Sequence, residues 1–109
     1  MAPDDGKYLQ RVLDTFIDVS IQRAGQTGVL AHEYRLSGEE FRSDTGRKRL
    51  HESVINDVEG FFDSSNTKAE FDNKYGNFTI SLDLGRCTLN RSQAENLSTA
   101  IAYYHEHNT

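Results

Sequence analysis

Between Phe78 and Leu84, apolar and polar residues alternate without a break. A period of two places successive side chains on opposite faces of a β-strand, so this segment predicts a strand with one buried and one solvated face. Residues 69–74 alternate in the same way, and residues 75–77 between the two segments have the composition of a turn. The two segments therefore predict an antiparallel hairpin that is covered on one side.

A second alternating segment spans residues 29–36, and we expect it to be a strand. Two interpretations are open for the residues that follow. The chain can turn at Ser37 into a short return strand at residues 39–42, which completes a second hairpin. Alternatively, Ser37 and Glu40 have the spacing of a capping box, which predicts a helix that starts at Ser37. We favour the hairpin because residues 42–49 contain no apolar side chain to form a buried helix face.

Three other segments carry apolar residues at helical spacing. The first helix is expected over residues 7–24 and the second over residues 45–62, with Asp44 as its expected N-cap. The third is expected to begin near Ser92, which forms a capping box with Glu95. The apolar stripe of the second helix consists of Leu50, Val54, Ile55, Val58, Phe61 and Phe62.

These elements predict an α+β fold in the order α-β-β-α-β-β-α. The expected architecture is a small antiparallel sheet of two hairpins, with three helices packed on one of its faces. A length of 109 residues suits a single domain over residues 1–109. A strand at the edge of such a sheet could pair with its copy, so a homodimer remains open.

The composition is that of a small acidic protein, with a formal net charge of −5. No stretch approaches the ~20 apolar residues that a membrane span needs, and the N-terminal residues do not resemble a signal peptide. Cys87 is the single cysteine, so the chain forms no internal disulfide, which suits a reducing compartment. We therefore expect a cytoplasmic protein with no membrane association.

The most distinctive local feature is a basic cluster in an otherwise acidic chain. In the predicted second helix most of its charges stand near the start, where they oppose the helix dipole. They could instead contact an acidic protein surface or phosphate groups. A tyrosine pair on the third helix should expose one ring, and exposed tyrosines are favoured at interfaces. The predicted partner-binding residues are Arg42, Arg47, Lys48, Arg49 and Tyr103.

No glycine-rich phosphate loop, nucleophile elbow, zinc-ligand spacing or dinucleotide fingerprint occurs in the sequence. We therefore expect a non-catalytic protein-binding module, such as a small inhibitor, an immunity-type protein or an adaptor, with no cofactor and no metal. The alternative is a nucleic-acid-binding module that uses residues 42–49, against which the net charge weighs. A third hypothesis is a small hydrolase built on His32 and His51, which requires that the two histidines share a cleft.

Overall fold

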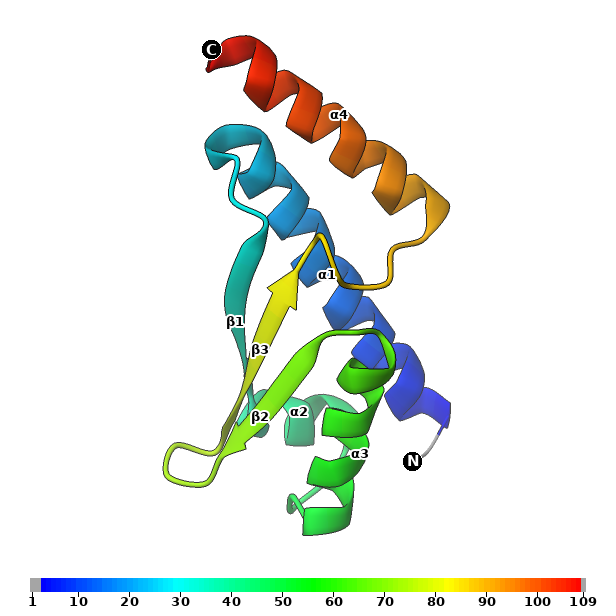
Figure 1. The fold of residues 1–109 in the computed structure, drawn as a ribbon. Helices are drawn as coiled ribbons and strands as arrows, with labels where there is room; N and C mark the ends of the chain where they lie inside the picture. Colours follow the sequence, from blue (N-terminus) through cyan, green and yellow to red (C-terminus); the bar gives the residue numbers. More distant parts are fainter. Residues whose placement is uncertain (1–2, 109) are drawn as a thin grey trace.

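The computed structural model describes residues 3–108, and this part of the chain folds into four helices and three strands (Figure 1). In chain order the elements are α1 (Pro3–Thr27), β1 (Ala31–Ser37), α2 (Gly38–Thr45), α3 (Glu52–Ser64), β2 (Lys68–Asp72), β3 (Asn77–Asp83) and α4 (Arg91–His107). The predicted α+β class with a small antiparallel sheet is confirmed. The predicted number of helices and the second hairpin are wrong.

The sheet has the strand order β1-β3-β2, and both neighbouring pairs are antiparallel. Its central strand, β3, places Ile80 opposite Tyr34 of β1 and Phe78 opposite Phe71 of β2. The predicted hairpin between β2 and β3 is present, and Gly76 in its turn has a φ of 69°. The side chains of Phe78, Ile80, Leu82 and Leu84 are buried, as their alternation predicts.

Residues 39–42 form part of helix α2, so the return strand predicted there is wrong. The Ser37 hydroxyl accepts a hydrogen bond from the Glu40 backbone N–H at 3.3 Å, and Gly46 ends the helix with a φ of 72°. A helix this short needs no long apolar stripe, because the fully buried Phe41 anchors it to the core. The capping spacing at Ser37 was therefore the stronger signal.

Helix α3 begins at Glu52 with His51 as its N-cap, seven residues later than expected. Arg47, Lys48 and Arg49 consequently lie in the preceding loop, and the predicted conflict between these charges and the helix dipole does not arise. Asp44 caps no helix start and instead accepts a hydrogen bond from the Tyr8 hydroxyl.

Helix α4 begins one residue before Ser92, and its capping box involves different residues from those predicted. The Asn90 side chain accepts a hydrogen bond from the Gln93 backbone N–H at 2.8 Å, and the Gln93 side chain accepts one from the Asn90 N–H at 2.9 Å. The capping box is therefore built from Asn90 and Gln93, whereas Ser92 and Glu95 do not form it.

The core lies between the sheet and the helices on one of its faces. Helix α4 runs beside α1 in the same direction, on the side away from the sheet (Figure 1). The molecule is elongated, with extents of 50 × 28 × 20 Å. Within residues 3–108, no helix is both long and apolar enough to cross a membrane. The main core side chains are Leu9, Leu13, Ile17, Phe41, Val58, Phe62, Phe78, Ile80 and Leu82.

Candidate functional site

The predicted basic cluster borders a cleft between α2, the loop of residues 46–51 and the turn of the β2–β3 hairpin. This cleft, which we call the basic cleft, has a volume of about 400 Å³. It is lined by Gly38, Arg42, Lys48, Arg49, Leu50, Phe71 and Gly76.

Two glycines bring the backbone together at the basic cleft. The Gly38 N–H donates a hydrogen bond to the Gly76 carbonyl oxygen at 2.9 Å, which joins the start of α2 to the hairpin turn. A Cβ atom at position 38 would overlap that oxygen, and it would also press against the Leu50 side chain. Only glycine therefore fits at position 38 without a shift of the hairpin turn.

Arg42 holds the loop beside the cleft in place. Its Nε donates a hydrogen bond to the Gly38 carbonyl oxygen at 3.4 Å, and its Nη1 donates one to the Lys48 carbonyl oxygen at 3.3 Å. The side chain is half-buried, and its guanidinium ties the loop to the first turn of α2. Arg42 thus shapes the cleft as well as adding charge to it.

Arg47 forms an ion pair within the fold. Its guanidinium makes two hydrogen bonds to the Asp5 carboxylate, at 2.9 and 2.5 Å, and the Asp5 side chain is only 6% exposed. The hydrogen bonds that Arg47 donates to Asp5 raise the pKa of Arg47 above its ordinary value. The guanidinium also lies over the ring of Phe41, 5.8 Å from its centroid. This pair ties the loop to α1, so the guanidinium of Arg47 already has a partner within the fold.

Lys48 and Arg49 are the two basic side chains of the cluster that remain exposed. Neither forms an ion pair with a carboxylate in the part of the chain that the structure describes. Both line the basic cleft. Two charges of the cluster are therefore exposed, and its other two charges hold the loop.

A second cleft of about 550 Å³ continues from the basic cleft, and Leu50 and Phe71 line both. We call the two together the end groove. The Phe71 backbone N–H donates a hydrogen bond to Glu59 Oε2 at 3.4 Å, which fixes that carboxylate beside β2. The groove thus has half-buried apolar side chains at its centre, basic groups at one end and carboxylates at the other. The second cleft is lined by Leu50, Glu52, Ile55, Asn56, Glu59, Phe71 and Asn73.

Tyr103 lies far from this groove, near the free end of α4 (Figure 1). Its ring is 54% exposed and stacks on His107, with the ring centroids 3.9 Å apart. The structure therefore does not bring Tyr103 together with the basic residues, and the five predicted contact residues do not share one surface.

The two histidines of the hydrolase hypothesis are also separated. His32 lies near the start of β1, where its Nε2 is 2.8 Å from the Val29 carbonyl oxygen, and His51 precedes α3 at the other end of the sheet. The hollow that His32 lines does not include His51. Within residues 3–108, no three His, Cys, Asp or Glu side chains converge as metal ligands. The residues that this hypothesis named therefore do not assemble into a site.

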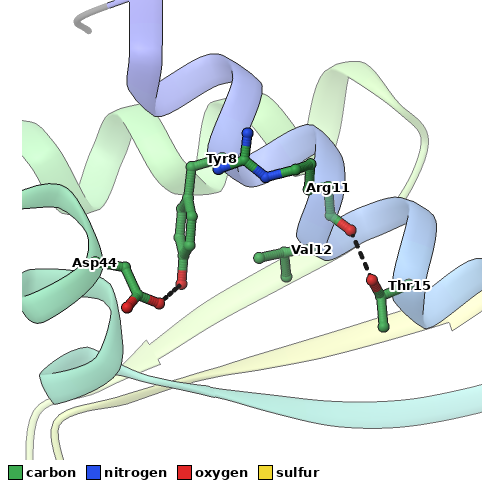
Figure 2. Close-up of a pocket in the computed structure, with 5 residues that line it drawn as sticks. All are labelled: Tyr8, Arg11, Val12, Thr15 and Asp44. Carbon is green, nitrogen blue, oxygen red and sulfur yellow. Dashed lines mark hydrogen bonds between the residues drawn. The ribbon is translucent and has the colours of Figure 1, made fainter.

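A further hollow of about 400 Å³ lies between α1 and α2 (Figure 2). The Tyr8 hydroxyl donates a hydrogen bond to Asp44 Oδ2, which Figure 2 marks with a dashed line, and the two oxygen atoms are 2.9 Å apart. Burial, and then the bond to Asp44, raise the pKa of Tyr8 to about 12. The phenol therefore stays protonated at neutral pH, and its hydrogen bond links α1 to α2. Val12 lines the hollow beside it.

Sequence reasoning missed the apolar centre of the end groove. It assigned Leu50 and Ile55 to a buried helix stripe, whereas Leu50 lies before α3 and both are half-buried. The sequence signal that could have indicated this exposure is the position of Leu50 directly after three basic residues. Compared with known proteins, the chain matches no family model, no curated protein and no solved structure.

Proposed function

We propose that the chain is a non-catalytic protein-binding module, of the kind found in small inhibitors, immunity-type proteins and adaptors, and that its partner binds in the end groove. The observation that carries this proposal is the half-buried apolar pair of Leu50 and Phe71 next to the exposed charges of Lys48 and Arg49. Protein interfaces combine an apolar centre with a polar rim in this way.

The charges of the groove define the partner's chemistry. Lys48 and Arg49 favour carboxylates on the partner at one end, whereas Glu52 and Glu59 favour basic groups at the other. An apolar side chain of the partner would anchor between them, against Leu50. The expected ligand is therefore a protein segment with an apolar anchor and an acidic flank.

The arrangement favours a protein over a nucleic acid. Affinity for nucleic acid depends on the number of phosphates that basic groups neutralise, and two of the four clustered charges are engaged within the fold. The net charge of −5 adds a general repulsion. A protein segment, by contrast, uses both the charges and the apolar centre of the groove.

We also propose a cytoplasmic location, supported by the single free thiol of Cys87. Burial raises the pKa of this thiol, which keeps it protonated and poorly reactive. Fractionation of the host cell should recover the protein with the cytosol. Recovery from the secreted or membrane fraction would contradict the proposal.

The binding test uses the double variant Lys48→Glu/Arg49→Glu and leaves Arg47 intact, because Arg47 pairs with Asp5 and its loss would destabilise the fold. A matched control is Arg86→Glu/Arg91→Glu, which makes the same change in net charge. Both control residues are highly exposed, with side chains 85% and 93% accessible, and they follow β3 at the opposite end of the sheet. The three proteins are used to capture partners from nuclease-treated host lysate, and the captured protein is identified, purified and titrated by calorimetry.

We expect a stoichiometric partner that the control binds like the wild type and that the Lys48/Arg49 variant binds at least about tenfold more weakly. Equal affinity for both variants would show that the end groove is not the binding surface. Titration with random-sequence DNA and RNA covers the alternative. Tight binding that falls steeply with salt, and that the Lys48/Arg49 variant loses, would replace the protein partner with a nucleic acid.

A further inference from the structure

Strand β1 is an edge strand whose outer side is open. It pairs only with β3, and no other described element of residues 3–108 runs along its outer edge (Figure 1). The Leu84 N–H donates to the Leu30 carbonyl oxygen at 3.0 Å, so the peptide groups of even-numbered residues point to β3. Those of Ala31, Glu33 and Arg35 therefore point outward, and all three residues are exposed.

The opposite edge of the sheet is protected. Helix α3 packs beside β2, and the Glu59 carboxylate accepts the outward N–H of Phe71. Proteins cover or blunt the edges of sheets because open backbone groups recruit further strands. One edge of this sheet is thus covered by the fold, and the other lacks a partner within the described chain.

We propose that two copies of the chain pair antiparallel through β1, so that the two three-stranded sheets join into one sheet of six strands. Full overlap of Ala31–Ser37 with its copy places residue 31 opposite residue 37. In that register Glu33 lies opposite Arg35 of the partner subunit, and Arg35 lies opposite Glu33 of the partner subunit. Two ion pairs form on the exposed face, with their peptide groups hydrogen-bonded.

The other registers available to the same outward groups are worse. A shift by two residues in either direction shortens the overlap and places Glu33 opposite its own copy, or Arg35 opposite its own copy. Like charges directly opposite each other destabilise a strand pair. Charged residues on an edge often prevent pairing, but here the full-length register turns them into attractive pairs.

The pairing also covers apolar surface next to the edge. The two-fold axis of the full-length register passes by Tyr34, whose ring is half-buried and stacks on Phe16, with centroids 4.6 Å apart. The two Tyr34 residues then form a non-hydrogen-bonded pair, the closest kind of cross-strand pair, at a Cα separation of about 4.5 Å.

The test is the oligomeric state, measured by sedimentation over a wide range of protein concentration. The wild type should approach twice the 12.4 kDa mass of one chain. Glu33→Arg and Arg35→Glu should each raise the dimer dissociation constant about tenfold, because either substitution creates two like-charge pairs. The double variant Glu33→Arg/Arg35→Glu should restore the wild-type value to within about threefold, since it exchanges the charges.

Glu70→Arg is the matched control, because Glu70 lies on the same exposed face but on β2. It should leave the dimer unchanged. Backbone hydrogen exchange adds a second readout, in which the amides of Glu33 and Arg35 become protected as the dimer forms.

A wild type that stays monomeric at every concentration overturns the proposal, as does a dimer whose outward β1 amides remain unprotected. A dimer that both single variants retain, or that the double variant fails to restore, overturns the register and the pairing through β1. Because β1 does not line the end groove, these outcomes are independent of the test with Lys48 and Arg49.

Discussion

Helices α3 and α4 both pack against α1, yet they bury very different amounts of side chain. The shorter α3 buries Val58 and Phe62 completely, whereas the longer α4 has one buried residue, Gln93, among those described. Helix α3 lies against both β2 and α1, whereas α4 packs mainly against α1. The difference in burial between these two helices therefore follows their packing neighbours and not their lengths.

The largest expected change in stability comes from a core substitution in α3, which can be compared with one in α4. Phe62→Ala should lower the free energy of unfolding by about 3–5 kcal/mol, because it leaves a cavity in the core. Leu97→Ala on the inner face of α4 should cost about 1 kcal/mol, since Leu97 is only half-buried. Urea unfolding of both variants gives the comparison, and similar costs would contradict the difference in packing.

The next prediction concerns how much the loop of residues 46–51, which precedes α3, contributes to stability. Arg47→Ala should cost about 2 kcal/mol, because the nearly buried Asp5 carboxylate loses the two hydrogen bonds that Arg47 donates to it. Lys48→Ala, one residue further on, should change stability by less than about 0.5 kcal/mol. Thermal unfolding at neutral pH measures both. If Arg47→Ala leaves the unfolding temperature unchanged, the loop is held by other contacts.

A smaller effect concerns the docking of α4. Gly28 has a φ of 74°, and a Cβ there would overlap the Tyr104 ring of α4. Gly28→Ala should cost about 1–2 kcal/mol and speed hydrogen exchange in α4 while α3 stays protected. Gly25→Ala is the control, because its Cβ would meet Ala100 at an ordinary 3.4 Å. Equal loss of protection in α3 and α4 would mean that the two helices unfold together.

The smallest expected change in stability concerns the hydrogen bond between Tyr8 of α1 and Asp44 of α2. The pKa of Tyr8 is raised from 10.0 to about 12 in the folded protein, so Tyr8 contributes stability that is complete below pH 10 and lost as the pH rises to 12. Tyr8→Phe should remove this part of the pH dependence and cost about 1 kcal/mol at neutral pH through the lost bond to Asp44. The test is the free energy of unfolding of the wild type and of Tyr8→Phe at neutral pH and between pH 10 and 12. If stability falls equally in both proteins as the pH rises, the prediction is wrong.

Local periodicity explains what could be predicted from the sequence. Alternation from Phe78 to Leu84 and helical spacing near residues 7–24 reflect which face of an element is buried, and the structure confirms both. The choice at Ser37 went wrong because the anchoring of α2 by Phe41 depends on neighbours distant in sequence. A single buried ring leaves no periodic signature.

The site was harder to predict than the fold. The sequence predicted Arg47 as one of the contact residues of the basic cluster, but Arg47 pairs with Asp5, 42 positions earlier in the chain, and no local pattern predicts that pair. Leu50 and Phe71 line one groove only because α3 returns the chain to β2. Sequence reasoning identified two charges at the groove, Lys48 and Arg49, and a third residue, Arg42, that mainly shapes it.

The backbone contact between Gly38 and Gly76 has a consequence for how the end groove can evolve. Any side chain at position 38 would displace the hairpin turn, so the stiff wall of the groove resists change. Substitutions at Lys48 or Arg49 alter only exposed charges and leave the backbone where it is. Under the proposed function, a lineage could therefore exchange the charges of Lys48 and Arg49 in step with those of a changing partner, while the shape of the groove stays the same.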